Sequence, residues 1–285
     1  MKPDYTFRKI ARMLTLVEND LPGADDLLLK VVFNNVPVIG ITGPPGAGKS
    51  TLVNSLIDEL VKKNARIAVL AVDPTSPFNF GSLLGDRIRM QSYAVHPNVF
   101  IRSVASRGAL GGLSAKIIEM TDILKASGFD YIIVETVGVG QSEVEIASLA
   151  DVTLLVLVPE SGDEIQSIKS GIMEIADAFL VNKADREGAD LFAENLRKMS
   201  GNQAAVFKTV ATKNEGIDRV ICFIKNFEPS AKNKSDLLAQ KAWDIIRQKR
   251  MSDLDFKLVQ SEISEASQKG DFNLYRYVES KIRHS

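Results

Sequence analysis

Cysteine, histidine and tryptophan are scarce in this sequence of 285 residues, which contains one Cys, two His and one Trp. The single cysteine, Cys222, excludes an internal disulfide and is typical of a protein in a reducing cytosol. The isolated residues His96 and His284 form with Cys222 no cluster of metal-ligand spacing. We therefore expect a cytoplasmic protein without a Cys/His metal centre.

Long apolar runs and an excess of one charge are also absent. No apolar run approaches the roughly 20 residues that a helix needs to cross a bilayer, and residues 1–7 lack the apolar centre of a secretory signal. The formal net charge is −1, which gives no reason to expect binding to nucleic acid or to an anionic membrane. The hydrophobic content of 45% is that of a globular protein with a sizeable core.

Short, β-branched apolar runs alternate with helix-like segments from residue 36 to about residue 227. Such runs are typical of strands buried on both faces of a mostly parallel sheet, with helices covering those faces. The predicted strands are 36–42, 67–72, 99–101, 131–134, 152–158, 178–181 and 205–209. The pattern predicts an α/β fold.

Amphipathic segments flank this region. Apolar residues at helical spacing predict a helix over 7–17, which either packs on the main domain, our preferred interpretation, or binds a partner, and a second short helix over 25–32. We assign 1–34 to N-terminal helices and 35–228 to the main domain.

The composition changes after Pro229, where a polar stretch precedes two amphipathic helical patterns. The first covers 236–250, and the second covers 254–282 with an interruption at Gly270. Their apolar stripes must be buried either on their own domain or on another subunit. We favour the second alternative and assign 229–285 to a helical arm that forms a homodimer.

The strongest motif is the glycine-rich stretch 43–51. It follows the predicted strand 36–42 and precedes a helical segment, 52–61, which is the order that a phosphate-binding loop requires. Its backbone N–H groups and the helix dipole would face phosphate oxygens, Lys49 would reach the β- and γ-phosphates, and the Ser50 hydroxyl would bind Mg²⁺. The sequence therefore predicts a P-loop NTPase whose triphosphate contacts Gly43, Pro44, Pro45, Gly46, Ala47, Gly48, Lys49, Ser50 and Thr51.

A candidate base-binding loop, 182–185, directly follows the predicted strand 178–181. The carboxylate of Asp185 can accept hydrogen bonds from guanine N1–H and the exocyclic amine, a pair of donors that adenine lacks. A site built on paired hydrogen bonds discriminates strongly, because the wrong base leaves buried groups unpaired. The loop therefore indicates GTP and GDP as the ligands.

Three further residues are expected to complete the base site. Asn182 would brace the loop, and the stem of Lys183 would lie along the base. The stretch 209–212 would lie beside the base and offer the backbone N–H of Ala211 to the guanine oxygen.

The predicted strand 131–134 ends in a carboxylate, Glu135, with Gly138 three residues further on. In P-loop enzymes an acid at this position holds Mg²⁺ or its waters, and the glycine N–H can sense the γ-phosphate. The usual residue is Asp, so the longer Glu is expected to reach the metal through water. The alternative is an acid that merely ends a strand.

Two more acidic residues are candidates for the Mg²⁺ shell or for activating the attacking water. Asp73 follows the predicted strand 67–72, and Asp86 lies in the stretch that comes after it. The neighbouring Arg87 and Arg89 are either phosphate contacts or ordinary helix charges.

The segment 163–169 follows the predicted strand 152–158 and is expected at the same edge of the sheet. It contains Gln166 and ends in Lys169. This lysine either delivers positive charge to the transition state, as an arginine finger does, or belongs to a solvated charged loop.

The sequence resembles a known family in seven stretches: 43–51, 73–77, 81–90, 102–113, 135–143, 162–169 and 182–185. The family is that of the methylmalonyl-CoA mutase-associated GTPase chaperones, the MeaB type, also labelled ArgK or LAO/AO transport system ATPase. The resemblance runs from about residue 11 to residue 227 and more loosely through the C-terminal helices. The runs that begin at Gly81 and Glu135 are far more specific than the phosphate loop.

The resemblance implies a GTPase of the signal-recognition-particle-like class, usually a homodimer through a C-terminal arm. It implies an adenosylcobalamin-dependent acyl-CoA mutase as partner, with GTP hydrolysis gating cofactor loading and helping to protect or reactivate that mutase. It also implies a switch loop that the mutase helps to order. The residues implied are Lys49 and Ser50 at phosphate and Mg²⁺, Asp73, Asp86 and Glu135 around the metal, and Gln166 and Lys169 for hydrolysis.

Two alternatives stay open from the sequence. A kinase or ATPase linked to amino-acid transport would need an acceptor pocket and has little use for a guanine loop such as 182–185. A metal-insertion GTPase usually carries a Cys/His metal site, which this sequence lacks.

Overall fold

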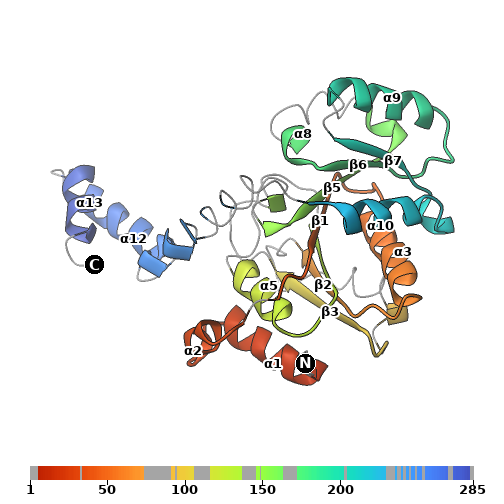
Figure 1. Ribbon diagram of the computed structural model, residues 1–285. Coiled ribbons are helices and arrows are strands. Elements are labelled where there is room, and N and C mark those ends of the chain that lie inside the picture. The colour runs from red at the N-terminus through yellow and green to blue at the C-terminus, as the bar shows by residue number, and fades with distance from the viewer. Residues whose placement is uncertain are drawn as a thin grey trace. The chain divides into compact units, whose positions relative to one another are not determined.

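The computed structural model describes residues 6–32, 34–73, 91–93, 95–105, 116–136, 146–147, 149–162, 172–201, 204–228, 235, 239, 242–243, 245–247, 249–251, 254–268 and 272–282. The chain divides into two compact units, Met1–Lys234 and Ser235–Ser285 (Figure 1).

The first unit is built on a parallel sheet, which has seven strands in the described residues, in the order β3-β2-β4-β1-β5-β6-β7. The strands are β1 (Val38–Thr42), β2 (Ile67–Asp73), β3 (Val99–Ala105), β4 (Tyr131–Thr136), β5 (Val152–Leu157), β6 (Ala178–Val181) and β7 (Ala205–Lys208). All the predicted strands are present, because continuous apolar runs suit strands that are covered on both faces.

Strand β3 is longer than the sequence predicts, since it continues through Arg102 and Ser103 to Ala105. The strand lies at one end of the strand order, where a polar side chain need not enter the core. Arg102 instead reaches helix α1 (Phe7–Glu18), where its guanidinium forms an ion pair with Glu18.

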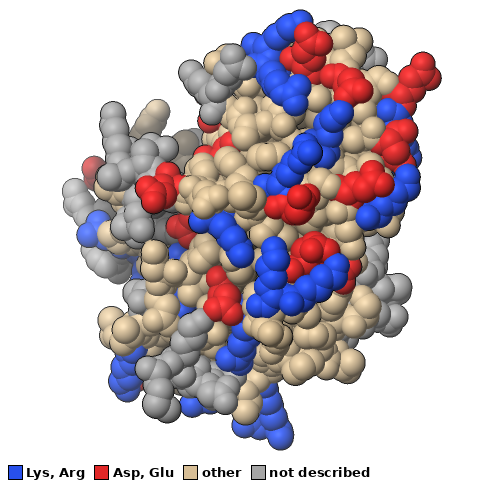
Figure 2. All heavy atoms as spheres, turned by 45° about the vertical axis from the view of Figure 1, so that its right-hand side comes forward, with Lys and Arg blue, Asp and Glu red and all other residues tan. Residues whose placement is uncertain are grey.

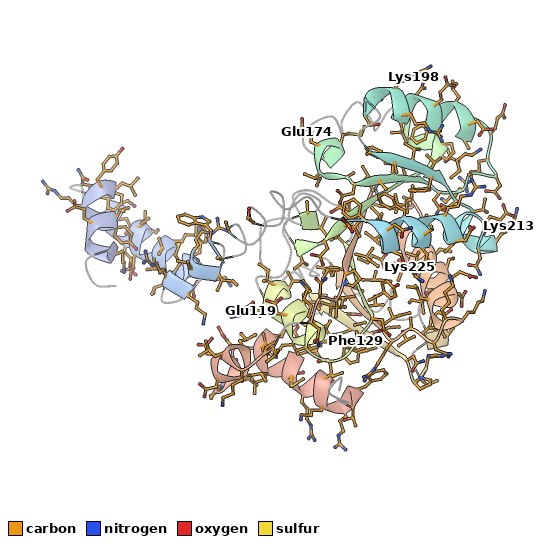
Figure 3. All side chains as sticks on the ribbon, viewed as in Figure 1. Glu119, Phe129, Glu174, Lys198, Lys213 and Lys225 are labelled. Carbon is orange, nitrogen blue, oxygen red and sulfur yellow. The ribbon has the colours of Figure 1, made fainter. Side chains whose placement is uncertain are left out.

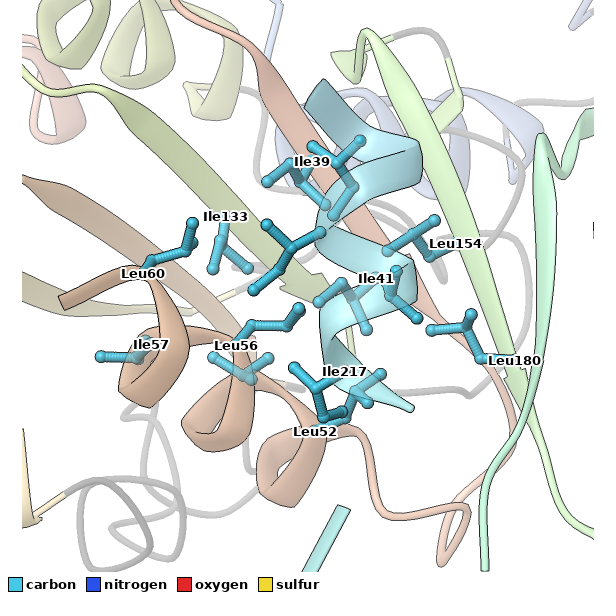
Figure 4. Packing of buried hydrophobic residues seen from close by; sticks show 14 of the residues in the cluster. Ile39, Ile41, Leu52, Leu56, Ile57, Leu60, Ile133, Leu154, Leu180 and Ile217 are labelled. Carbon is cyan, nitrogen blue, oxygen red and sulfur yellow. The ribbon is translucent and has the colours of Figure 1, made fainter. Parts of the chain in front are cut away.

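Helices cover both faces of the sheet. One face packs against α3 (Lys49–Val61) and α10 (Ile217–Asn226), as Figure 4 shows for residues that include Ile41, Leu56 and Ile217. The other face packs against α1, α5 (Ile117–Lys125) and α9 (Ala189–Met199). The shorter helical elements are α2 (Ala24–Leu29), α8 (Ile172–Ile175), η1 (Gln91–Tyr93), η2 (Pro159–Gly162) and η3 (Ala211–Lys213).

The expectation that the N-terminal helix packs on the main domain is confirmed. The α1 residues Ile10, Leu14 and Val17 are buried in the cluster that also holds α5. At its start, the ring of Phe7 lies 5.6 Å from that of Phe100 and 6.2 Å from that of Phe129, which Figure 3 labels. Apolar burial of this extent is the main driving force for such packing.

The second unit contains α12 (Phe256–Ser267) and α13 (Leu274–Ile282), so the single helical pattern predicted over 254–282 forms two helices. Tyr277 donates to Glu262 at 2.6 Å, and Lys281 pairs with the same carboxylate at 2.6 Å. No residue of α12 is buried. Among the described residues of this unit, the exposed large apolar side chains are Trp243, Ile246, Met251, Phe256, Leu258, Leu274, Tyr275 and Val278.

Among the described residues, no helix has the length and apolarity that crossing a membrane would require. On the face shown in Figure 2, Lys and Arg side chains lie among Asp and Glu side chains. Ion pairs between lysine and acidic side chains of the first unit include Lys208 with Asp190 and Lys198 with Glu194.

Aspartates at the amino ends of three strands connect neighbouring strands of the sheet. Each carboxylate accepts a hydrogen bond from a backbone N–H near the start of the neighbouring strand. The pairs are Asp130 with Arg66 at 2.9 Å, Asp151 with Val38 at 2.8 Å and Asp177 with Thr153 at 2.7 Å. Burial raises the pKa of the Asp177 carboxyl, although the N–H of Thr153 opposes that shift.

Asp177 should therefore make stability depend on pH in the acidic range. Because its folded-state pKa lies above the unfolded-state value, the stability that the proton adds is present below the unfolded-state pKa and is lost as pH rises through the folded-state pKa. Asp177→Asn keeps an acceptor oxygen and has no proton to lose. Relative to wild type, its free energy of unfolding should rise with pH across this window, as measured by urea denaturation at several pH values.

The control for this experiment is Asp177→Leu, which leaves the buried N–H of Thr153 without its acceptor. Because it also lacks the titrating proton, this variant should be about 1–3 kcal/mol less stable than Asp177→Asn at every pH. A difference between the Asn variant and wild type that does not vary with pH would contradict the assignment.

Candidate functional site

The carboxyl ends of the strands bring the candidate site residues to one edge of the sheet. The glycine-rich loop follows β1, Glu135 lies near the end of β4, Asn182 follows β6, and Ala211 lies just beyond β7. Because the strands are parallel, these positions share an edge, which is where ligands bind in open α/β sheets.

The loop between β1 and α3 takes a conformation that needs glycine at Gly43. This residue has φ +141°, and a Cβ added to it would lie 2.1 Å from the carbonyl oxygen of Val156. The chain therefore lies close against the backbone of β5 at Gly43 before it turns into α3. The helix begins at Lys49, three residues earlier than the sequence predicts, so Lys49 and Ser50 lie in its first turn.

The Lys49 side chain closes this loop on itself. Its ammonium donates to the carbonyl oxygens of Gly43 at 2.7 Å and Pro44 at 3.0 Å, and the residue is only 7% exposed. A buried cation at the amino end of a helix, beside backbone N–H groups, is an environment that suits an anion such as a phosphate.

Ser50 and Glu135 meet at the same place. The hydroxyl of Ser50 donates to Oε1 of Glu135 at 2.7 Å, and both residues are buried. Behind them, the hydroxyl of Thr136 donates to that of Thr42 at 3.0 Å. A hydroxyl and a carboxylate are hard oxygen donors, and Mg²⁺ is commonly held by one or two such groups, so these residues fit that ion.

The loop after β6 is joined to the phosphate loop by two direct hydrogen bonds. Asn182 donates from Nδ2 to the carbonyl oxygen of Ala47 at 2.9 Å, and Lys183 donates from Nζ to that of Gly46 at 2.8 Å. The contact is close, because a Cβ added to Gly48, at φ +87°, would lie 2.5 Å from Nδ2 of Asn182. The structure thus brings together two stretches that are distant in the sequence.

Asn182 also holds the loop after β7. Its Oδ1 accepts hydrogen bonds from the Thr209 hydroxyl at 3.3 Å and from the backbone N–H of Ala211 at 3.2 Å. The sequence assigned this N–H to the guanine oxygen, whereas the structure gives it a partner within the protein. Asn182 is 2% exposed, so it braces three segments from a buried position.

Asp185 projects from the same loop and is exposed, with its side chain at 45% exposure. Its Oδ2 lies 3.5 Å from the ammonium of Lys213 in η3, and Figure 3 labels Lys213. The N–H of Ala184 donates to the carbonyl oxygen of Thr209 at 3.0 Å. The loops after β6 and β7 therefore form one wall, with a carboxylate on it.

Several candidate residues lie outside the described part of the chain. They are Asp86, Gly138, Gln166 and Lys169, together with Arg87 and Arg89. Asp73 ends β2, but its side chain is also outside the described residues.

Ser55 is a residue that the sequence analysis missed. It lies on α3, is 3% exposed, and donates to the carbonyl oxygen of Ala211 at 2.6 Å. Its place on the helix that follows the phosphate loop was the only signal that could have drawn attention to it.

Comparisons with known proteins support the assignment of this edge of the sheet as a nucleotide-binding site. A family profile described as "Methylmalonyl Co-A mutase-associated GTPase MeaB" matches residues 10–271. A putative GTPase of Pyrococcus abyssi is 51% identical over 74% of this chain and 68% of its own length. The GTPase ArgK of Escherichia coli is 37% identical over 77% of this chain and 71% of its own length.

A third relative, the mitochondrial methylmalonic aciduria type A homolog of Caenorhabditis elegans, is 38% identical over 62% of this chain and 48% of its own length. Among solved structures, that of a LAO/AO transport system kinase matches with a TM-score of 0.67 and 25% identity, over 98% of this chain and 93% of the other. The nickel complex of HypB from Helicobacter pylori matches with a TM-score of 0.50 and 18% identity, over 80% and 97%, and shares the fold alone.

The fold is that of a P-loop NTPase, and the relatives named as GTPases imply that it binds a guanine nucleotide. The profile match extends from the first helix into the second unit. This chain belongs to the MeaB family of methylmalonyl-CoA mutase-associated GTPases.

Proposed function

We propose that this protein binds GTP with Mg²⁺, hydrolyses it to GDP and phosphate, and thereby gates the loading of adenosylcobalamin into an acyl-CoA mutase that it also protects or reactivates. One observation carries the nucleotide part. Asn182 and Lys183 bond directly to the carbonyls of Ala47 and Gly46, so the candidate base loop and the candidate phosphate loop form one site.

The phosphate end of this site would act through charge and position. The loop 43–51 and the first turn of α3 offer backbone N–H groups, and Lys49 would turn from its carbonyl partners to the β- and γ-phosphates. Ser50 and Glu135 would hold Mg²⁺, with Asp73 and Asp86 as further candidates around it. Mg²⁺ held there would supply positive charge that neutralises the charge developing on the phosphates during transfer.

The base end would select guanine through Asp185. Its exposed carboxylate can accept hydrogen bonds from both N1–H and the exocyclic amine, and the wall of the loops after β6 and β7 positions it. Because the N–H of Ala211 is bonded to Asn182, contact with the guanine oxygen would require that 3.2 Å bond to be shared or exchanged.

The mutase part rests on the family and on the named relatives. The profile describes GTPases associated with methylmalonyl-CoA mutase, and the Caenorhabditis elegans relative is a methylmalonic aciduria type A homolog. We place Gln166 and Lys169 in a loop that the mutase helps to order, and Gly138 where its N–H would sense the γ-phosphate. The unit 235–285, with its exposed apolar side chains, would pair with a second copy to form a cytoplasmic homodimer.

Stimulation by the mutase is the expected result that tests this function. Hydrolysis of GTP by the purified protein should be slow and should accelerate on addition of methylmalonyl-CoA mutase. Lys169→Ala should remove most of that acceleration, by about a thousandfold or more if the lysine acts as an arginine finger does, while the rate without mutase stays nearly the same.

Lys225→Ala is the matched control, because this lysine is in the last turn of α10, away from the strands' carboxyl ends. It should leave both rates unchanged. Equal stimulated rates in the Lys169 variant and wild type would contradict the role of that lysine, and no stimulation in wild type would contradict the choice of partner.

A second candidate function is phosphoryl transfer to an amino acid or transport component. It is favoured by the similarity to a structure described as a LAO/AO transport system kinase. This function predicts comparable use of ATP and phosphate transfer to an acceptor. For the third alternative, metal insertion, no cluster of three or more His, Cys, Asp or Glu suited to a metal occurs in the described residues.

A further inference from the structure

A buried hydroxyl joins the phosphate-loop helix to the loop after β7. Ser55, on the second turn of α3, lies 2.6 Å from the carbonyl oxygen of Ala211 and 3.0 Å from that of Thr51. A serine has a single hydroxyl hydrogen to donate, and the shorter distance assigns it to Ala211. The residue thus forms a bond outside its own helix, to a partner 156 positions away.

This bond completes a ring of hydrogen bonds around the candidate base site. The N–H of Ala211 donates to Asn182, and Asn182 donates to the carbonyl oxygen of Ala47 in the phosphate loop. The phosphate loop continues into α3, and Ser55 returns from α3 to Ala211. The peptide groups on both sides of Ala211 are therefore held, one through its N–H and the other through its C=O.

The segment that Ser55 holds also positions Asp185. Ala211 begins η3, which ends at Lys213, and Lys213 pairs with Asp185. The carbonyl oxygen of Thr209, two residues before Ala211, accepts a hydrogen bond from the N–H of Ala184, next to Asp185. A shift of the η3 turn would move Lys213, the partner of the carboxylate, and would disturb the backbone contact beside Asp185.

We propose that Ser55 is a positioning residue for the nucleotide base: through the Ala211 carbonyl it fixes the η3 turn, and so sets how strongly the site prefers guanine to adenine. This inference rests on the proposed guanine site. Ser55 itself would not touch the base, since its hydroxyl is buried and already donates to the carbonyl oxygen of Ala211.

A purely structural role would look different, and Ser127 provides the comparison. Ser127 is fully buried, and its hydroxyl donates at 2.7 Å to the carbonyl oxygen of Ile123, four residues earlier at the end of α5. That bond stays local and contacts none of the candidate site residues described above. Loss of either hydroxyl should lower stability, but only loss of Ser55 should change base selection.

The test measures dissociation constants of GDP, ADP and inorganic triphosphate for wild type, Ser55→Ala and Ser127→Ala. We expect Ser55→Ala to reduce the ratio of ADP to GDP dissociation constants by about tenfold, the effect of weakening one hydrogen bond to the base when the η3 turn shifts. Inorganic triphosphate, which has no base, should bind Ser55→Ala as it binds wild type. Ser127→Ala should keep the wild-type ratio although its melting temperature falls.

The outcomes separate this inference from the proposed function. A wild-type protein that binds ADP as tightly as GDP would overturn the guanine site and the inference with it. A wild-type preference for GDP that Ser55→Ala fully retains would overturn the inference alone, as would an equal loss of preference in Ser127→Ala. If Ser55→Ala does not fold, Ser55→Cys, which keeps a weak donor, should show a smaller loss, and an unchanged ratio would overturn the inference.

Discussion

A Lys49→Met variant should keep its fold and lose GTP hydrolysis by about a hundredfold or more, the effect of removing one preorganised charge from a phosphoryl-transfer site. The methionine side chain has nearly the length of the lysine stem, so the helix start at Lys49 is preserved. What it lacks is the ammonium that now bonds to the carbonyls of Gly43 and Pro44. Steady-state phosphate release, with and without mutase, measures the loss.

Lys183→Met is the matched control for this variant. Both lysines donate to carbonyl oxygens of the same loop, Lys49 to Gly43 and Pro44 and Lys183 to Gly46. Lys183 lies on the base side, so its loss should raise KM and leave kcat nearly unchanged, whereas loss of Lys49 should lower kcat. A fall in kcat for Lys183→Met as large as that for Lys49→Met would contradict the separation of phosphate and base ends.

The sequence predicted those parts of the site whose residues lie close together along the chain. A strand, a glycine-rich turn and a helix specify the phosphate loop within about twenty residues, because the turn needs Gly43 and the helix needs only its own periodicity. Glu135 could be predicted for the same reason, since its place after an apolar run puts it at the ligand edge of a parallel sheet. The structure then brings it to 2.7 Å from Ser50.

The sequence could not predict the contacts that link distant segments. Ser55 has no motif, and its partner Ala211 is defined only when β7 and α3 have packed around the sheet. The hydrogen bond between Asn182 and Ala211 likewise depends on how closely the loops after β6 and β7 approach. Strand β3 was predicted too short because Arg102, at the edge of the sheet, interrupts the apolar pattern without interrupting the pairing.

An Asp185→Asn variant should change the base that the protein prefers from guanine to xanthine. Asn has one acceptor and one donor group, whereas the carboxylate accepts only. Guanine presents two donors to this position, and xanthine presents one donor and one carbonyl acceptor. We expect affinity for GDP to fall at least about a hundredfold, because a site built on paired hydrogen bonds rejects a mismatched base strongly, and affinity for the xanthine nucleotide to rise.

This exchange should leave the fold intact, since the side chain of Asp185 is 45% exposed and its ion pair with Lys213 spans 3.5 Å. Exposed pairs of this kind contribute about 0–1 kcal/mol to stability. Lys213→Met, which removes the same ion pair and keeps the carboxylate, is therefore the control and should still prefer GDP. If both variants kept the wild-type preference, guanine would be recognised elsewhere, because a carboxylate that contacts the base cannot be replaced by an amide without reversing one hydrogen bond.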